Sequence, residues 1–156
     1  MLNPDFKDML SALSEANAEF LVVGAYALAA HGYPRATGDL DIWVRPTPEN
    51  AARVWHALCK FGAPVSKLRV EDFSTPEIVY QIGVAPRRID IMTSISGVEF
   101  ETAWGNHGIA NLGGLQAPVL GREDLLVNKR ASGRTKDLAD VAWLENSDQN
   151  PRQTLQ

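Results

Sequence analysis

Apolar residues recur at helical spacing near the start of the chain. Phe6, Met9, Leu10 and Leu13 fall on one face of a helix that we predict over about residues 4–17. The apolar run FLVV that follows, ending at a glycine, predicts a short buried strand. The alanine-rich stretch AYALAAHG comes next and predicts a helix, because alanine and leucine are good helix formers.

Strict alternation of apolar and polar residues follows in the sequence DLDIWV. Leu40 and Ile42 share one face of the predicted strand, and Asp39, Asp41 and Trp43 share the other, as in a half-buried strand. Two acidic residues on one face of an otherwise apolar strand are unusual. These carboxylates are therefore the first candidates for chemistry.

The rest of the chain predicts further helices and strands. Thr47 followed by Pro48 predicts the start of a helix that runs to about residue 61. The remaining predicted elements are strands at 78–82 and 87–92, a hairpin at 109–119, and helices at 97–106, 122–132 and 135–145. In the last helix we expect Leu138 and Val141 to face the core. This order of elements indicates an α/β fold with a mixed, twisted sheet and flanking helices.

Composition narrows the class of protein. The 156 residues are 45% hydrophobic and 22% charged, which fits one globular domain. A net charge of -4 argues against a protein that coats nucleic acid by bulk attraction. Cys59 is the only cysteine, so an internal disulfide and a cysteine-rich zinc site are excluded. Its place in a helix with apolar neighbours predicts that it is buried.

The ends of the sequence predict one domain with a tail. We expect residues 1–146 to form a single domain and the polar residues 147–156 to be flexible. The longest apolar run, at 20–30, is too short to span a bilayer, and the first ten residues do not resemble an export signal. The expected location is the cytoplasm, with no membrane partner.

The predicted site begins with three aspartates. Asp39 and Asp41 stand roughly 7 Å apart by the rise of a strand, and their side chains point the same way. Asp90 lies on the polar face of the strand at 87–92, which can pair beside the first. Oxygen ligands without histidine or cysteine favour Mg²⁺ or Mn²⁺ over zinc.

The segment before the aspartates suits a phosphate group. At Gly24 a strand passes directly into a helix, which offers free backbone amides at a position without a side chain. His31, at the other end of that helix, is expected to pack there and not to act as a base.

Asp-x-Asp pairs occur in several unrelated kinds of protein. Asp39 and Asp41 can simply solvate the outer face of an edge strand. A calcium loop is excluded, because apolar residues follow the pair where further oxygen ligands and a glycine are needed. Phosphatases and glycosyltransferases usually carry such a pair at the end of an apolar strand, whereas here the strand follows the pair.

The motifs together resemble a known superfamily. The glycine turn, helix, loop and Asp-x-Asp strand of LVVGAYALAAHGYPRATGDLDIWV, with the later aspartate of RRIDIM, resemble nucleotidyltransferases of the DNA polymerase beta superfamily. The segment EDLLVNKRASGRTKDLADVAWL resembles the lysine helix and Lys-Asp helix of minimal nucleotidyltransferases related to abortive-infection toxins. The resemblance covers about residues 20–144.

This resemblance implies a metal-dependent enzyme. A nucleoside monophosphate would pass from a nucleoside triphosphate to a hydroxyl of RNA or protein, and the chain would be the toxin of a toxin–antitoxin pair. It implies that Asp39, Asp41 and Asp90 hold Mg²⁺ or Mn²⁺ and that Lys129 acts in catalysis by pairing with a triphosphate oxygen. Arg35, in the loop before the aspartates, is expected to reach phosphate as well.

The remaining polar residues have weaker roles. Arg134 and Lys136 are further candidates for phosphate, and Asp137 is expected to be a structural partner of the helix lysine or a helix cap. The amides of Gly24 and Ala25 complete the predicted nucleotide site.

Two other functional hypotheses stay open. The superfamily usually has glycine or serine where this chain has Ala25, which favours a catalytically silent nucleotide-binding or partner-binding module. A protein-interaction subunit with no nucleotide site is the third. The three aspartates and Lys129 favour the enzyme.

Overall fold

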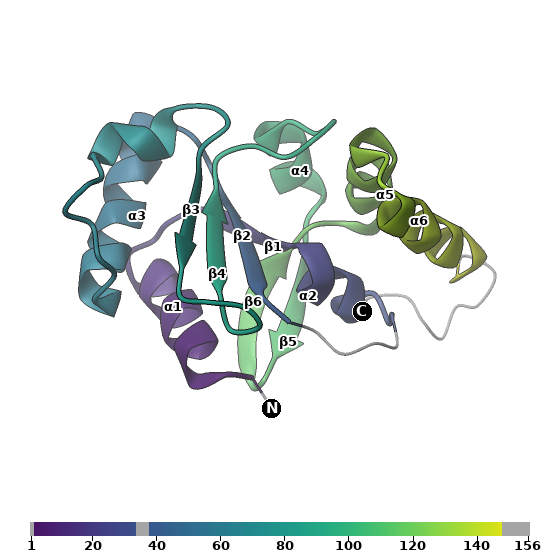
Figure 1. Cartoon of the computed structure of the whole chain (residues 1–156), viewed down its shortest axis with the longest axis horizontal. Helices are drawn as coiled ribbons and strands as arrows, with labels where there is room; N and C mark the ends of the chain where they lie inside the picture. The colour runs from purple at the N-terminus through teal and green to yellow at the C-terminus, as the bar shows by residue number, and fades with distance from the viewer. Residues whose placement is uncertain (1, 34–37, 148–156) are drawn as a thin grey trace.

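A mixed sheet runs through the molecule, with helices on both of its faces (Figure 1). The computed structural model describes residues 2–33 and 38–147. The strands are β1 (Phe20–Val23), β2 (Leu40–Val44), β3 (Val79–Ile82), β4 (Ile89–Met92), β5 (Gly108–Leu112) and β6 (Leu115–Val119). The helices are α1 (Pro4–Glu15), α2 (Gly24–Ala30), α3 (Pro48–Phe61), α4 (Phe100–Asn106), α5 (Arg122–Ser132) and α6 (Thr135–Ser147), with a short 3-10 helix at Val70–Ser74.

The strand order is β3-β4-β2-β1-β6-β5. β2 pairs with β4 in parallel, and β1 pairs with β6 in parallel, whereas the other neighbours are antiparallel. The β2–β4 register places Asp41 directly opposite Asp90. The predicted α/β class, mixed sheet and flanking helices are confirmed.

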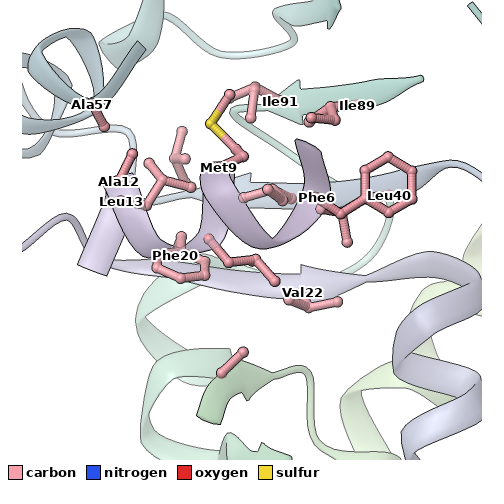
Figure 2. Packing of buried hydrophobic residues seen from close by; sticks show 14 of the residues in the cluster. Phe6, Met9, Ala12, Leu13, Phe20, Val22, Leu40, Ala57, Ile89 and Ile91 are labelled. Carbon is pink, nitrogen blue, oxygen red and sulfur yellow. The ribbon is translucent and has the colours of Figure 1, made fainter. Parts of the chain in front are cut away.

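One face of the sheet is covered by α1 and α3 (Figures 1 and 2). Phe6, Met9 and Leu13 of α1 pack against Phe20 and Leu40 of the sheet, and all five are at most 2% exposed. The helical period of α1 and the alternation in β2 therefore bury complementary faces.

The opposite face is covered by α2, α4, α5 and α6. Trp43 lies in this second core, 1% exposed, with its ring edge-on to Phe100 at 5.0 Å. The expected grouping of Trp43 with the aspartates on one face holds.

Several helix ends match the sequence pattern. Thr47 is the N-cap of α3, and its hydroxyl accepts a hydrogen bond from the backbone N–H of Asn50 at 3.3 Å. Gly62 ends that helix with a φ of +91°. The side-chain oxygen of Asn3 accepts from the N–H of Asp5 at the start of α1.

Two predictions about helix faces are wrong. Cys59 is exposed, because α3 turns its neighbour Leu58 toward the sheet. Leu138 of α6 is 52% exposed, while Asp137 and Asp140 are fully buried. Basic partners from outside α6 neutralise these aspartates, and the helical period of α6 alone does not reveal such partners.

The ends of the described chain bear on two further expectations. The predicted tail at 147–156 lies outside the described residues except for Ser147, the last residue of α6. Within the described part of the chain, none of the helices has the length and apolar character that crossing a bilayer requires.

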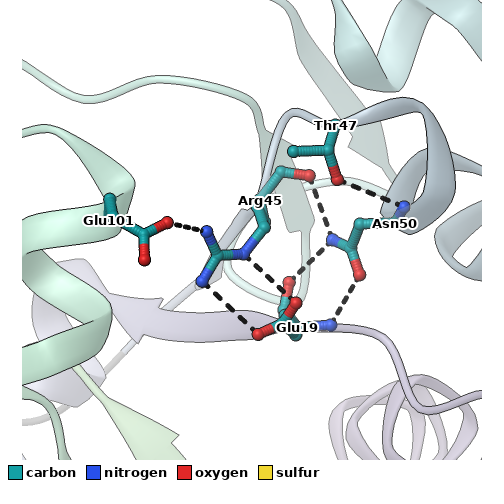
Figure 3. A network of polar contacts seen from close by, with 5 residues as sticks. All are labelled: Glu19, Arg45, Thr47, Asn50 and Glu101. Carbon is teal, nitrogen blue, oxygen red and sulfur yellow. Dashed lines mark hydrogen bonds and ion pairs between the residues drawn. The ribbon is translucent and has the colours of Figure 1, made fainter.

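A polar network ties the β2–α3 turn to the segment before β1 (Figure 3). The Oδ1 atom of Asn50 accepts from the N–H of Glu19 at 2.7 Å, and its Nδ2 donates to the carbonyls of Glu19 and Arg45 at 2.9 and 3.0 Å. The side chain of Arg45 pairs with Glu19 at 3.2 Å and also with Glu101. Asn50 is 1% exposed, so its groups have no water to replace these partners.

We predict that Asn50→Ala destabilises the fold by about 1–3 kcal/mol, because the N–H of Glu19 loses its partner in a buried place, while the carbonyls of Glu19 and Arg45 each lose one of two donors. Urea unfolding followed by circular dichroism measures the change. The matched control is Asn111→Ala, which removes one hydrogen bond, to the N–H of Gly114, at an exposed hairpin turn. We expect less than about 1 kcal/mol there. Equal losses in the two variants would contradict the role given to Asn50.

Candidate functional site: a carboxylate cleft at the edge of two parallel strands

The three predicted aspartates line one cleft of about 610 Å³. Asp41 and Asp90 stand side by side on the paired strands β2 and β4. Asp39 lies one residue before β2 begins, not within it. Its Oδ1 accepts from the backbone N–H of Arg88 at 2.9 Å, so a side chain continues the β2–β4 hydrogen-bond ladder there.

Gly24 lies against the carboxylate of Asp41. A Cβ atom at Gly24 would come within 2.2 Å of Oδ2 of Asp41. The backbone at Gly24 also has a φ of +67°, in the left-handed region. The strand-to-helix turn predicted at this glycine is confirmed. The group that lies close to the glycine in the structure is the Asp41 carboxylate.

Arg88 is the cation of the cluster, and the sequence pattern does not single it out. Its Nε and Nη2 donate to the two carboxylate oxygens of Asp90 at 2.7 and 3.2 Å. Its Nη2 also lies 3.3 Å from Oδ2 of Asp39. The available signal was spacing, because a residue two positions before Asp90 on a strand shares its face.

Burial and neighbouring charge act together on Asp41. Burial raises the pKa of Asp41, and the carboxylates of Asp90 and Asp39 raise it further, to about 6, although Arg88 opposes the shift. A hydrogen bond with Asp90 contributes in the same direction. The cluster thus holds more negative charge than its single guanidinium balances.

The donor set suits a hard divalent cation. The residues lining the cleft offer carboxylate oxygens and neither histidine nor cysteine. As the side chains stand, no group of three or more His, Cys, Asp or Glu residues within 2–33 and 38–147 is arranged to hold a metal ion. Two of the three carboxylates are bound to Arg88 instead.

Lys129 also lines the cleft, and it carries two ion pairs. Its Nζ lies 3.2 Å from Asp137 and 3.1 Å from Asp140, both of which are on α6 and fully buried. Arg134 donates to the second oxygen of Asp137 at 2.7 Å. Burial alone raises the pKa of Asp137, but the hydrogen bonds from Arg134 and Lys129 outweigh it, so the pKa lies below its ordinary value. The structural role expected for Asp137 agrees with these contacts.

The other predicted phosphate-binding residues lie around the same cleft. Ala25, Arg134 and Lys136 line it. Arg35 lies outside the described residues. His31 caps the end of α2, where its Nε2 lies 2.9 Å from the carbonyl oxygen of Leu120, and burial lowers its pKa. It lies outside the cleft lining, as expected of a packing residue.

A second cleft, of about 840 Å³, adjoins the first. Ser94 and Ile95 line both. At this boundary Glu77 has a φ of +62°, and its N–H donates to the hydroxyl of Ser94 at 2.9 Å. Such left-handed geometry in a non-glycine residue is uncommon and often marks functional regions.

Comparison with known proteins identifies the fold. No protein-family model and no curated protein matches the sequence. A provisionally assigned nucleotidyltransferase of Thermotoga maritima matches over 94% of this chain and 96% of its own, with a TM-score of 0.62 and 19% identity. The lincosamide antibiotic adenylyltransferase LnuA, solved with lincomycin bound, matches over 93% and 97%, with a TM-score of 0.57 and 14% identity. The antibiotic-resistance factor ANT(2'')-Ia matches over 96% and 84%, with a TM-score of 0.60 and 16% identity.

These likenesses extend over nearly the whole chain and concern its architecture. The chain has the nucleotidyltransferase fold of the polymerase beta type. At identities of 14–19%, the likeness establishes the fold alone.

We predict that Gly24→Ala destabilises the protein by about 1–3 kcal/mol, because the new methyl group overlaps the carboxylate of Asp41 and the backbone conformation disfavours a side chain. Thermal unfolding measures the effect. Gly105→Ala is the control, since a Cβ at Gly105 meets nothing within 4 Å. A Gly24 variant as stable as the control variant would show that Asp41 lies elsewhere in solution.

A second prediction concerns pH and Asp41. The pKa of Asp41 in the folded protein, about 6, exceeds its ordinary value of 3.8, so ionising this group at higher pH destabilises the fold. Asp41→Asn is nearly isosteric and cannot ionise. We expect it to be more stable than the wild type above about pH 7 by at most about 3 kcal/mol, at about 1.4 kcal/mol per pKa unit. The difference should shrink as pH falls through about 6, and it vanishes only below the ordinary pKa of 3.8, where Asp41 is protonated in the folded and the unfolded state alike.

Urea unfolding of both proteins at several pH values between about 4 and 8 measures this difference. Titrating groups that do not interact with Asp41 are common to the two proteins and cancel from the difference. A difference that stays constant across this range would mean that Asp41 keeps an ordinary pKa.

Proposed function

We propose that the chain is a metal-dependent nucleotidyltransferase, which moves a nucleoside monophosphate from a nucleoside triphosphate to an acceptor hydroxyl. The observation that supports this most is the convergence of Asp39, Asp41 and Asp90 on one cleft of this fold. Asp41 and Asp90 come from different strands and Asp39 from the segment before β2. Carboxylates that only solvated an edge strand would lie at the border of the sheet. β2 and β4 are instead neighbouring strands in its interior.

The charges of the cleft are arranged for a triphosphate. Mg²⁺ or Mn²⁺ held by the three aspartates would neutralise phosphate oxygens and lower the pKa of the acceptor hydroxyl. Arg134 and Lys136 line the same cleft, and we assign them, with Lys129 and Arg35, to the triphosphate. Because Lys129 already has two carboxylate partners, it serves as a shared and rigidly held charge. Gly24 and Ala25 line the same cleft and offer their backbone to the triphosphate, without bulky side chains in the way.

The transfer itself is a substitution at the α-phosphorus. The acceptor oxygen forms a bond to that phosphorus, the bond to the bridging oxygen of the β-phosphate breaks, and pyrophosphate leaves with the electron pair. We assign to Asp90 the place nearest the acceptor hydroxyl, where its carboxylate takes the proton. Its burial among charged groups keeps bulk water away from that proton.

The acceptor enters over the second cleft in this proposal, because that cleft opens into the first at Ser94 and Ile95. We consider two classes of acceptor. The resemblance to minimal nucleotidyltransferases points to a hydroxyl of RNA or protein, with the chain as the toxin of a toxin–antitoxin pair. The lincomycin-bound neighbour adds small hydroxyl-bearing antibiotics as the second class.

The test is incubation with each α-labelled nucleoside triphosphate and Mg²⁺, together with a cell extract or with lincomycin as acceptor. We predict label transfer by the wild type and a loss of transfer activity of more than about 100-fold in Asp41→Asn. Residues that only hydrogen-bond to a metal ligand contribute about 10- to 100-fold, and we expect a metal ligand itself to contribute more. Asp8→Asn, an exposed change on α1 with the same charge difference, should keep full transfer.

The outcome separates the competing hypotheses. Transfer retained in Asp41→Asn would remove Asp41 from the catalytic machinery. Thermal stabilisation by nucleotide without transfer would favour a silent binding module, the hypothesis that Ala25 supports. The absence of both transfer and stabilisation would favour a protein-interaction subunit.

A further inference from the structure

Arg88 contacts the carboxylate cluster at four points. Its guanidinium makes a bidentate contact with Asp90, at 2.7 and 3.2 Å, and lies 3.3 Å from one oxygen of Asp39. Its backbone N–H donates to the other oxygen of Asp39. Bidentate contacts of this kind are the stronger form of charge-assisted hydrogen bond. The side chains of Asp39 and Asp90 are 21% and 10% exposed, so solvent screens these contacts only in part.

The position of Arg88 follows from the strand. It lies directly before β4 and two residues before Asp90, and its guanidinium reaches the face of the sheet from which the Asp90 carboxylate projects. Arg87 has the opposite phase and is exposed. The guanidinium is therefore held beside the aspartates by the backbone at the start of β4, where the N–H of Arg88 binds Asp39.

A guanidinium and a divalent cation compete for the oxygens of these two carboxylates. The oxygens of Asp39 and Asp90 that bind Arg88 are those that a cation needs, and two positive charges at that separation repel each other. Binding of a cation alone would also leave Arg88 without an anionic partner. A triphosphate supplies both further oxygen ligands for the cation and an anionic partner for the displaced arginine.

We propose that Arg88 is the resident counter-ion of the cleft: it competes with the divalent cation for Asp39 and Asp90, and it pairs with the triphosphate when the cation takes its place. This inference rests on the proposed function and adds a coupling to it. The cation binds weakly without nucleotide and tightly with it, because only the triphosphate accepts the released guanidinium.

Arg88→Gln tests the competition directly, with Mn²⁺ affinity measured by calorimetry in the absence of nucleotide. We expect Arg88→Gln to bind Mn²⁺ at least about 10-fold more tightly than the wild type, within the usual range of coupling between sites. The matched control is Arg87→Gln, which removes the same charge one residue away and should change the affinity by less than about 2-fold. With a triphosphate analogue that resists cleavage between its α- and β-phosphates, the wild type should gain more Mn²⁺ affinity than Arg88→Gln.

The alternative is that Arg88 only holds the aspartates in place. In that case Arg88→Gln would bind Mn²⁺ no more tightly than the wild type, or less tightly, and the proposal would be overturned. If Arg88→Gln does not fold, Arg88→Lys serves instead. Arg88→Lys keeps the charge but loses the bidentate contact, and we expect it too to bind Mn²⁺ more tightly than the wild type.

Two outcomes distinguish this proposal from the proposed function. Unchanged Mn²⁺ affinity with normal nucleotide transfer would contradict the role of Arg88 alone. Absence of Mn²⁺ binding in every variant, with and without nucleotide, would contradict the proposed function itself.

Discussion

The parallel pairing of β2 with β4 is the constraint on which the site depends. Its register sets Asp41 opposite Asp90, so two carboxylates occupy adjacent positions on one face of a largely buried sheet. The charge of Asp90 raises the pKa of Asp41, and a fold keeps two such charges together only with compensating charge nearby. Arg88 provides that charge from the residue directly before β4.

The same constraint accounts for the turn after β1. β1 pairs with β2 so that Val23 stands opposite Asp41, which brings the next residue, Gly24, against the carboxylate. A side chain at Gly24 would occupy the volume of the Asp41 oxygen. The glycine turn and the acidic pair are thus one structural unit, although 16 positions separate Gly24 from the first residue of β2, Leu40.

The C-terminal helices complete the cleft in a different way. Lys129 of α5 and Arg134 between the helices bind two buried aspartates of α6, and these contacts join the two helices beside the sheet. Removing one member of such a buried group costs more than the intact group contributes, because it leaves a charge without a partner. Lys129 is therefore held in a fixed position at the edge of the cleft, as its proposed contact with a triphosphate requires.

Much of the fold was predictable because its signals are local. Thr47 with Pro48 marks the start of α3, Gly62 marks its end, and the alternation around Ile42 marks a strand, since each depends only on neighbouring residues. The acidic face of β2 was likewise visible as a departure from that alternation. The grouping of Asp90 with Asp41 could be anticipated from the superfamily pattern, but the pairing of β2 with β4 is a contact between distant segments that the tertiary structure decided.

The tertiary structure also decided where the cations go. Arg88 could not be told from Arg87 by composition, since only the phase of β4 and the position of Asp39 turn one of them into a partner of the cluster. The buried face of α6 was mispredicted for the same reason: Asp137 is a polar residue by sequence, and it becomes a core residue only when Lys129 and Arg134 reach it from outside the helix. Spacing and capping among neighbouring residues were enough to specify the helices and strands and to make the three aspartates candidates for the site. Which charges meet was left to the packing, because an ion pair between segments depends on distances that no local pattern contains.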